Sequence, residues 1–358
     1  MNKLFEPLAF TRGPAMKNRF MLAPLTNSQS HDDGALSEDE FHWLTMRAKG
    51  GFALTMTCAA HVQAAGRGFP GQLGIFSDQH LAGLTRLAAA IRKEGSVSAV
   101  QLHHAGMRSP AGLIGTTPLC PSTNEEFGAR AMTTAEVEQL IEDFIVAAER
   151  ADHAGFDGVE LHGAHGYVLC QFLSSDINHR EDRFGGSLDN RARPLFDIIA
   201  GIRTRCRPDF QVGVRLSPER FGMQLDEVRT VAQRLMAEGA IDYLDMSLWD
   251  VFKEPQADEY KGRSLMSYFT ELDRGKVRLG VAGKVAKPEH ALACLDAGVD
   301  FVLLGRAAIL HHDFPDQAGR DPGFTPVSLP VTRAHLEAQG LGDAFIGYMR
   351  GWKGFVKD

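Results

Sequence analysis

The chain has 358 residues, of which 44% are hydrophobic and 23% are charged, and this balance predicts a folded protein with a large core. Its 45 acidic residues exceed its 38 Lys and Arg residues and give a formal charge of −7, so no overall positive field would attract nucleic acid or an anionic membrane. Chemistry on a small molecule is therefore the expected role.

The amino-terminal residues and the cysteines indicate a cytoplasmic location. The opening stretch MNKLFEPLAFTRG contains Lys3, Glu6 and Arg12 and has no apolar segment of signal-peptide length. No apolar run approaches the roughly 20 residues that a membrane helix needs. The five cysteines are widely spaced and include no CxxC pair, which argues against disulfides, zinc sites and iron–sulfur clusters.

Taken in chain order, the sequence alternates short apolar segments with amphipathic ones. At the recurring junction a helical stretch ends at glycine, and an apolar run then leads into polar or glycine residues, as expected for a strand that is buried on both faces. Eight such strands are predicted, over residues 18–25, 49–58, 94–104, 154–163, 211–217, 238–247, 277–283 and 297–306.

Helices are predicted between these strands. Ser37 and Glu40 indicate a capping box that opens a helix over 37–48, a second helix covers 134–154, and Pro288 opens a third over 288–297. Eight β–α units in a chain of this length predict an α/β fold, a single (β/α)₈ TIM-barrel domain over residues 1–358. Long loops follow strands three and four, at 105–133 and 163–187, and such loops are usually functional.

A doubly wound nucleotide-binding sheet is the structural alternative. The stretch GRGFPG supplies Gly66, Gly68 and Gly71 in a GxGxxG spacing. Pro70 interrupts the motif and no helix is predicted to begin at its last glycine, so the geometry that places a phosphate on a helix amino terminus is missing. The barrel is therefore the preferred fold.

Barrel enzymes carry their active sites at the carboxyl ends of the strands. The residues expected at those ends are Pro24, Leu25, Thr26, Thr57, Cys58, Gln101, His103, His104, the stretch 162–167, Arg215, Asp245, Gly283, Gly305 and Arg306. Most of them are polar, so this end of the barrel is the candidate site.

Several of these residues have two interpretations. Gly283, Gly305 and Arg306 follow the last two strands, where barrels commonly bind a phosphate, or they form two tight turns with a solvated arginine. Gln101 could form a two-point hydrogen bond to an amide-like ring edge, or it is a buried side chain that the backbone satisfies. A buried Arg215 needs a negative partner, because an unpaired buried charge is very costly.

The stretch LHGAHGY, residues 161–167, places His162, His165 and Tyr167 together after the fourth strand. A metal site is disfavoured, because strand one carries no HxH pair and no HExxH pattern is present. Considered alone, the two histidines are better explained as a structurally satisfied pair than as donors to a substrate.

Together the motifs resemble those of the old yellow enzyme family, the FMN-dependent ene-reductases. The resemblance covers nearly the whole chain through NRFMLAPLT, QLHHAG, ELHGAHGYVLCQFLSSDINHREDRFGGSLDNRAR, VRLSP and VDFVLLGR. It implies a flavoprotein oxidoreductase that binds FMN and accepts hydride from NADH or NADPH. The substrate that it implies is an α,β-unsaturated carbonyl or nitro compound, whose activated C=C bond is reduced.

The resemblance also implies roles for individual residues. His162 and His165 would donate hydrogen bonds to the substrate oxygen, hydride from flavin N5 would reach the β carbon, and Tyr167 would protonate the α carbon. The residues implied to hold the flavin are Pro24, Leu25, Thr26 and Cys58 beside the ring, Gln101 at its pyrimidine edge, Arg215 at N1 and O2, and Gly283, Gly305 and Arg306 at the phosphate.

Some positions depart from the family pattern. Thr26 occupies a site that is Cys in one branch, Ser28 stands where that branch has an aromatic residue, and Met107 interrupts the usual Gly-Arg pair. These changes are expected to affect substrate range and redox tuning. Arg350, in the carboxyl-terminal YMRGW, would reach a neighbouring subunit's site in a homo-oligomer, or it is a solvated tail residue.

Other functions fit parts of the sequence. A barrel lyase or isomerase of a phosphorylated substrate would share the phosphate site, but such an aldolase usually carries a strand-borne lysine, whereas Lys253 and Lys284 lie in predicted loops. A dihydroorotate dehydrogenase or hydroxyacid oxidase would lack the paired histidines followed by tyrosine. A non-catalytic flavin-binding protein would have no need of Tyr167 as an acid.

Overall fold

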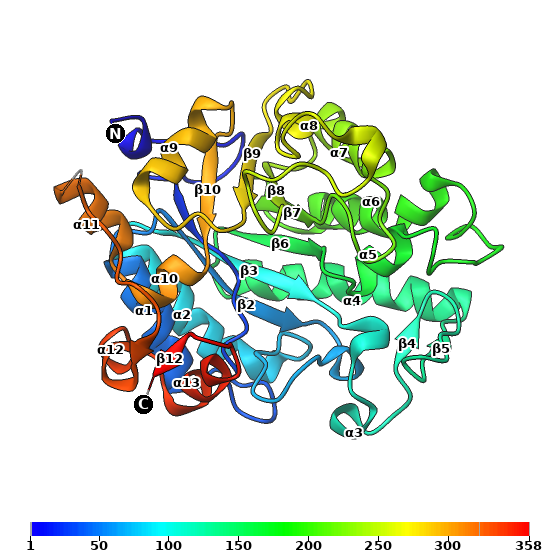
Figure 1. Cartoon of the computed structure of the whole chain (residues 1–358). Helices are drawn as coiled ribbons and strands as arrows, with labels where there is room; N and C mark the ends of the chain where they lie inside the picture. The colour runs from blue at the N-terminus through cyan, green and yellow to red at the C-terminus, as the bar shows by residue number, and fades with distance from the viewer. Residues whose placement is uncertain (1, 322, 358) are drawn as a thin grey trace.

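The computed structural model describes residues 2–321 and 323–357, and eight parallel strands in it form a closed barrel (Figure 1). The barrel strands are β1 (Phe20–Leu22), β2 (Leu54–His61), β3 (Val97–His103), β6 (Gly158–Gly163), β7 (Gln211–Leu216), β8 (Tyr243–Ser247), β9 (Arg278–Ala282) and β10 (Phe301–Leu304). Each strand pairs with the next in chain order, and β10 closes on β1 with Phe20 opposite Val302. The predicted fold class is confirmed.

Helices connect the strands and cover the outside of the barrel (Figure 1). Between and after the strands lie α1 (Glu38–Lys49), α2 (Leu81–Lys93), α4 (Thr134–His153), α6 (Leu188–Arg205), α7 (Leu225–Glu238), α8 (Ser267–Thr270), α9 (Pro288–Asp296), α10 (Arg306–Leu310) and α11 (Phe314–Arg320). In α4, for example, Val137, Leu140 and Phe144 recur at helical spacing and are buried. Such a stripe holds one face of a helix on the barrel while the other face stays in solvent.

Side-chain caps start two of the helices where the sequence predicts helix starts. Thr133 and Glu136 form a reciprocal capping box at α4. At α1, Ser37 accepts a hydrogen bond from the Glu40 amide as predicted, but the Glu40 carboxylate does not return to Ser37. It accepts hydrogen bonds from Asn27 and Ser30 instead, so the predicted capping box is only half formed. The carboxylate is used to hold the segment that follows β1.

The interior of the barrel changes character along its axis. Its amino-terminal end is apolar and is closed by the segment before β1, where Leu8 and Met16 are buried among barrel side chains. The Gln211 side chain fixes this segment by donating hydrogen bonds to the carbonyls of Arg12 and Pro14, both at 2.8 Å. The other end of the interior is lined by polar and charged groups, and this end is called the mouth below.

Both predicted long loops contain short elements. The loop after β3 includes α3 (Ala111–Ile114) and a two-stranded sheet of β4 (Leu119–Cys120) and β5 (Arg130–Ala131). The loop after β6 includes α5 (Val168–Leu173). These elements build the wall of the mouth on that side.

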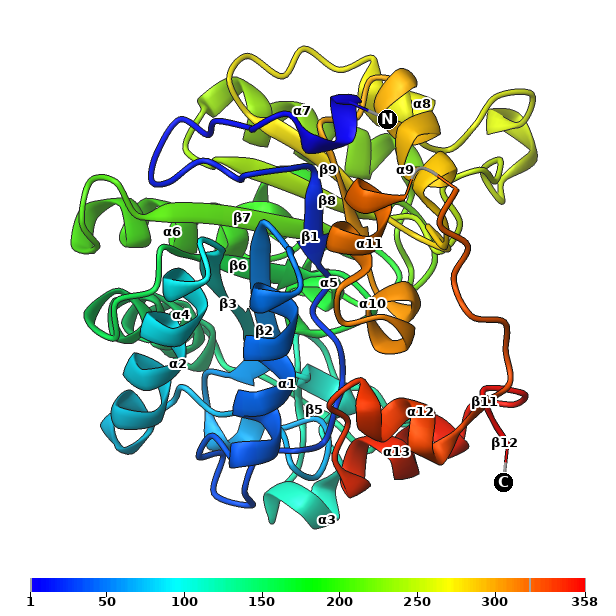
Figure 2. The same cartoon turned by 90° about the vertical axis from the view of Figure 1, so that its left-hand side faces the viewer.

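The chain continues past the barrel with β11 (Val331–Thr332), α12 (Arg333–Ala338), α13 (Asp343–Arg350) and β12 (Val356–Lys357). Helix α13 packs on α1, where the Phe345 and Trp43 ring centres are 4.8 Å apart, and Figure 2 shows this carboxyl-terminal segment beside α1 and α10. Within the described ranges, no helix combines the length and apolar character needed to cross a bilayer.

Candidate active site

A chain of imidazole rings crosses the mouth from β3 to β8. Nδ1 of His103 lies 3.4 Å from Nδ1 of His162, and Nε2 of His162 lies 3.2 Å from Nδ1 of His165. The chain ends at Ser247, whose hydroxyl is 2.7 Å from Nε2 of His165. Burial and the nearby Arg215 and Arg108 guanidinium groups lower the pKa of His165 to about 3. The rings are therefore neutral at pH 7 and can donate hydrogen bonds without carrying a charge.

The turn after β6 is what brings these side chains together. Strand β6 ends at Gly163, and His165 and Gly166 then adopt positive φ angles of 60° and 72°. The His165 amide donates a hydrogen bond to the Ser217 hydroxyl at 3.0 Å, which fixes the turn against the end of β7. A non-glycine residue held at positive φ costs about 1–2 kcal/mol, and such strain is typically found at functional sites.

Tyr167 occupies the N-cap position of α5, and its ring packs against the imidazole chain. Its ring centre lies 4.4 Å from that of His103 and 5.0 Å from that of His162. Burial raises the pKa of the phenol, and the Arg108 guanidinium, 5.0 Å from the ring centre, acts in the opposite direction. The phenol is therefore protonated at neutral pH and can act as a proton donor.

Directly inside the mouth, two buried carboxyl groups share one guanidinium. Nε2 of Gln101 donates a hydrogen bond to Oε1 of Glu160 at 2.8 Å, and Nε of Arg215 lies 3.0 Å from Oδ2 of Asp245. The second pair is close but is not aligned as a hydrogen bond, so both oxygens of Asp245 and one of Glu160 keep unused acceptor capacity. Burial raises the pKa of both acids, and the charge of Asp245 raises that of Glu160 further.

The structure therefore supplies the negative partner that the sequence requires for Arg215. It also shows that the Gln101 carboxamide nitrogen already has a partner within the barrel. That nitrogen has two N–H donors, so a second N–H and the carboxamide oxygen remain for the predicted two-point contact to a ring.

The three residues predicted beside the flavin ring, Pro24, Leu25 and Thr26, follow the carboxyl end of β1 and are half-buried. Leu25 lies close to the turn after the neighbouring strand β10, because a Cβ added to Gly305 would lie 3.5 Å from its Cδ2. The loop of β1 and the turn after β10 are therefore neighbours, which brings Pro24, Leu25 and Thr26 next to the predicted phosphate residues.

The prediction for the Cys58 side chain needs correction. The register of β2 against β3 shifts between Met56 and Ala59, and this irregularity reverses the alternation of side chains. Cys58 consequently belongs to the core between barrel and helices, where its thiol lies against the buried Glu40 carboxyl group of α1. Only its backbone can border a group held at the mouth.

Gly283 and Gly305 follow β9 and β10, as predicted for a phosphate site. Gly283 has φ +151°, and a side chain there would lie 2.7 Å from backbone atoms of Trp249 and Asp250. The loops after β8 and β9 approach so closely here that only glycine fits, and this favours the tight-turn interpretation of Gly283. Arg306 is exposed and forms no ion pair or hydrogen bond with the described part of the chain, so its charge is available to an anion.

The sequence interpretation missed three residues of the site. Ser247 ends the strand predicted over 238–247 and anchors His165. Glu160 lies two residues before His162 on the same strand, so the alternation of side chains could have placed it on the same inner face. Arg108 follows Met107, which separates it from Gly106 in the GMR stretch. Its side chain contacts the His165 carbonyl oxygen.

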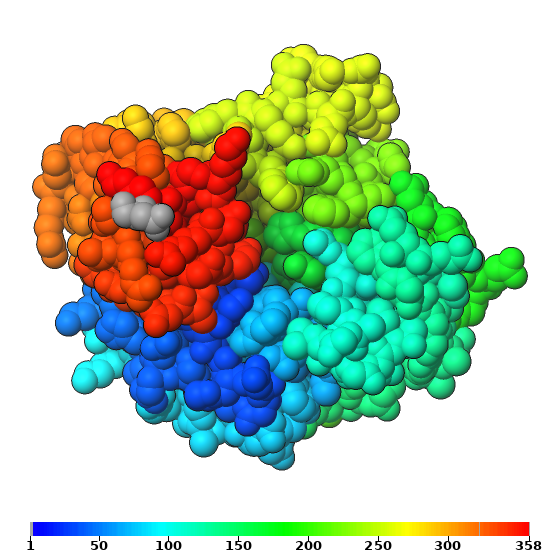
Figure 3. Space-filling model, turned by 60° about the horizontal axis from the view of Figure 1, so that its bottom comes forward, coloured from blue at the N-terminus to red at the C-terminus, as the bar shows by residue number. Residues whose placement is uncertain are grey.

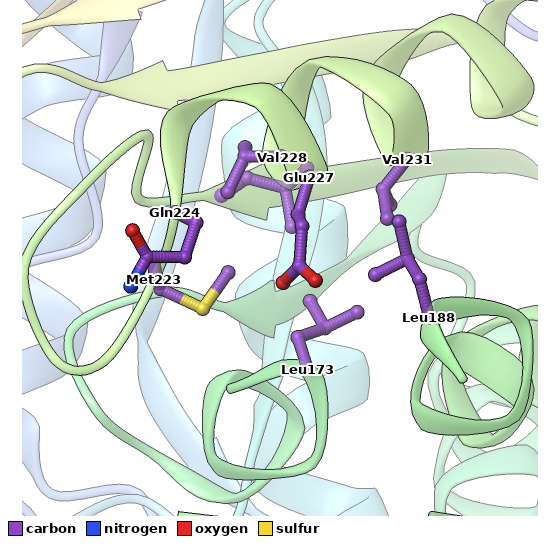
Figure 4. A pocket seen from close by; sticks show the side chains of 8 residues that line it. Leu173, Leu188, Met223, Gln224, Glu227, Val228 and Val231 are labelled. Atoms are coloured by element: carbon purple, nitrogen blue, oxygen red, sulfur yellow. The ribbon is translucent and has the colours of Figure 1, made fainter. Parts of the chain in front are cut away.

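The surface shows a recess at the mouth, and a small crevice lies elsewhere, between helices. In Figure 3 a hollow with a green floor is bordered by blue, cyan, yellow and red parts of the chain, which shows that distant segments meet around the strand ends. The small crevice of Figure 4 lies between α5, α6 and α7 and is lined mainly by Leu173, Leu188, Val228 and Val231. It contains none of the polar groups described above.

The comparisons with known proteins identify one family of enzymes. The model of a family described as NADH:flavin oxidoreductase / NADH oxidase matches residues 3–321. A probable NADH-dependent flavin oxidoreductase of Bacillus subtilis is 36% identical over 318 residues, which cover 86% of this chain and 85% of that protein. An NADH:fumarate oxidoreductase of Klebsiella pneumoniae is 33% identical over 353 residues, but the chain spans only 38% of that longer protein.

Solved structures give the same result. An old yellow enzyme homologue from Zymomonas mobilis superposes with a TM-score of 0.82 at 26% identity, over 96% of this chain and 99% of that one. Morphinone reductase in complex with tetrahydroNAD gives a TM-score of 0.80 at 28% identity, over 99% and 98% of the two chains.

The chain belongs to the NADH:flavin oxidoreductase / NADH oxidase family. It is an NAD(P)H-dependent flavin oxidoreductase of the old yellow enzyme type, and the predicted cofactors, FMN with NADH or NADPH, are confirmed.

Proposed function

We propose that the protein is an ene-reductase that reduces the activated C=C bond of α,β-unsaturated carbonyl or nitro compounds. The observation that carries the proposal is the convergence of two neutral imidazoles and a protonated phenol on one turn at the mouth. Bound FMN would supply the hydride, having received it from NADH or NADPH.

The residues at the mouth fit the flavin. Arg215 would hold its electron-rich edge, and the exposed Arg306 beside Gly305 would bind the phosphate. Pro24, Leu25 and Thr26 would border the ring with the backbone at Cys58. These assignments rest on the unused charge of Arg306 and on the position of Arg215 within the polar end of the barrel.

The chain's own residues would divide the work on the substrate. His162 and His165 would donate hydrogen bonds to the carbonyl or nitro oxygen, which withdraws electron density from the conjugated bond. In the structure Nε2 of His162 faces Nδ1 of His165, and Nε2 of His165 faces Ser247, so a bound substrate oxygen would take these N–H donors over from the imidazole chain. Tyr167 would give its phenolic proton to the α carbon and regain one from solvent.

The lyase alternative is not retained. The family match is to flavin oxidoreductases, and the two lysines considered for a Schiff base are engaged, Lys253 with Glu219 and Lys284 with Asp250 at 2.9 Å.

The test separates the two half-reactions in anaerobic stopped-flow measurements on the FMN-loaded protein. Tyr167→Phe should slow flavin reoxidation by cyclohexenone by about 10² to 10⁴ and change flavin reduction by NAD(P)H little. The matched control is Tyr260→Phe, on the η5 turn (Asp258–Tyr260), whose ring packs on Tyr268 and has no contact with the imidazole chain among the described residues. Equal slowing of both half-reactions by Tyr167→Phe would refute the assignment of Tyr167 as the acid.

A further inference from the structure

We propose that Arg108 and Arg220 form a subsite for a carboxylate carried by the alkene substrate, so that the favoured substrates are anionic. The inference rests on the proposed ene-reductase function and assigns a substrate class to the same mouth. Its basis is two arginines without acidic partners in the described part of the chain, one in contact with His165 and the other stacked on Trp249, whose ring lies near His165.

Arg108 reaches the site from the loop after β3. It lies in the short η4 turn (Gly106–Arg108), its side chain is exposed, and its Nη1 donates a hydrogen bond to the His165 carbonyl oxygen. Its Cζ is 5.0 Å from the centre of the Tyr167 ring. A guanidinium has five N–H donors, so this contact fixes the position of the group and leaves donors for a ligand.

Arg220 lies in the loop after β7 and is linked to the same histidine through an aromatic ring. Its Cζ lies 4.3 Å from the centre of the Trp249 ring, and that ring centre is 6.4 Å from the centre of the His165 ring. The ring centre of Phe221, the next residue, is also 6.4 Å from that of His165. The arginine is exposed at the rim and is supported by an aromatic face instead of a carboxylate.

The acidic side chains in the neighbouring loops pair with lysines and not with these arginines. Glu219 pairs with Lys253 and also accepts a hydrogen bond from the Gln256 amide at 2.7 Å. Asp250 pairs with Lys284. Throughout residues 2–321 and 323–357, neither Arg108 nor Arg220 forms an ion pair with an acid. In a chain of formal charge −7, two arginines on the loops after β3 and β7 therefore have no acidic partner among the described residues.

The rim that carries Arg220 is held in an unfavourable backbone conformation. Arg220, Phe221 and Trp249 have φ angles of 70°, 55° and 65°, and a bridge between Arg220 and Met223 closes the turn. Side chains other than glycine adopt this conformation at an energetic cost, which surrounding contacts must offset. The arginine and the two rings are thus positioned before any ligand binds.

Guanidinium chemistry favours a carboxylate as the ligand. The planar fork of arginine matches the two oxygens of a carboxylate and remains charged at all physiological pH values. The Trp249 and Phe221 rings would cover the apolar part of the same molecule. The fitting substrate is an enone or enoate with a carboxylate separate from the oxygen that His162 and His165 bind.

The test compares a carboxylate substrate with its neutral ester. The pair is (E)-4-oxopent-2-enoate and its methyl ester, used with the FMN-loaded wild type, Arg108→Met and Arg220→Met. We expect the wild type to have the lower KM for the acid, and each variant to reduce the ester-to-acid ratio of KM values by about 10-fold, the loss of one charge-assisted contact. Arg92→Met serves as control, because Arg92 is an exposed arginine of α2 with no acid partner in the described part of the chain.

Binding without turnover gives a second measurement. Titration calorimetry with the saturated product, 4-oxopentanoate, should show about 10-fold weaker binding to either variant, with its methyl ester much less affected. Unchanged acid-to-ester discrimination in both variants, with thermal melting equal to that of the wild type, would overturn the subsite.

The anion could instead be a phosphate of the nicotinamide donor, and the flavin-reduction half-reaction distinguishes the two. Variants that raise the Kd for NADH or NADPH but keep the ester-to-acid ratio would assign the arginines to the donor and overturn the proposal. If the proposed ene-reductase function itself is wrong, the result is different: the wild type would then reduce neither the methyl ester nor cyclohexenone.

Discussion

Arg215 on β7 and Asp245 on β8 are direct partners in the parallel register, and Nε of the arginine lies 3.0 Å from Oδ2 of the aspartate. On the other side, His162 of β6 is the register partner of Arg215. One guanidinium therefore stands between the buried acids and the imidazole chain. Its charge opposes protonation of His165 and favours ionisation of Asp245.

Ser247 positions His165, and its removal should weaken substrate binding. Ser247→Ala deletes the hydroxyl that is 2.7 Å from Nε2 of His165. We expect the KM for cyclohexenone to rise about 5-fold, since a hydrogen bond contributes about 1 kcal/mol. The matched control is Ser109→Ala, because the Ser109 hydroxyl is buried at the same end without a hydrogen-bond partner. Equal effects of the two substitutions would contradict the positioning role.

Arg306 should bind the phosphate of FMN. We expect Arg306→Met to weaken FMN binding by about 10-fold or more, because a charge-assisted contact is lost, and to change riboflavin binding little. Fluorescence titration of the apoprotein with each flavin measures both. Arg320→Met, an exposed arginine of α11, is the control. Equal losses of affinity for FMN and for riboflavin would show that Arg306 does not act through the phosphate.

The buried Glu160 should make the protein less stable as the pH rises. Burial raises its pKa from 4.5 to about 8, so the folded state retains a proton that the unfolded state releases between these values. Stability is therefore lost across that window, by up to about 1.4 kcal/mol per pH unit for one proton. Glu160→Gln, which mimics the neutral acid, should match the wild type near pH 4.5 and exceed it at pH 8 in urea unfolding.

The control for this measurement is Glu259→Gln, an exposed residue, which should follow the wild-type pH dependence. A Glu160→Gln variant whose stability falls with pH as steeply as that of the wild type would contradict the buried-acid explanation.

Replacement of two glycines by alanine should change the stability of the protein in opposite directions. In Gly283→Ala the new Cβ would lie 2.7 Å from the Trp249–Asp250 backbone, so we expect a loss of about 1–3 kcal/mol. Gly347 lies inside α13 with no atom near its added Cβ, so Gly347→Ala should stabilise by roughly 0.5–1 kcal/mol. Thermal melting of both variants tests this, and a neutral Gly283→Ala would show that the two loops can move apart.

The sequence predicted the barrel well because its pattern repeats. Each unit carries its own apolar strand and amphipathic helix, so an error in one boundary leaves the series intact. The strand predicted over 18–25 is an example, since only Phe20–Leu22 pairs and the following proline and polar residues turn into the mouth. The helix predicted over 288–297 ends one residue earlier, at Asp296.

Side-chain direction was harder to predict than strand position. Cys58 faces α1 because the register shift in β2 depends on contacts with β3, which the residues of β2 do not encode by themselves. Glu40 satisfies the capping-box pattern, but the loop after β1 offers Asn27 and Ser30 as alternative partners. Long-range pairs of this kind, including Ser247 with His165, appear only when the chain has closed into a barrel.

The segment that closes the amino-terminal end of the barrel has a consequence for hydration of the interior. Phe10 packs on Tyr243, with ring centres 5.7 Å apart, and Leu8 and Met16 cover the rest of that end. Among the described residues this apolar packing leaves the opposite opening as the route by which water would reach Glu160 and Asp245. A flat ligand bound over that opening would therefore slow the equilibration of these acids with the bulk solution.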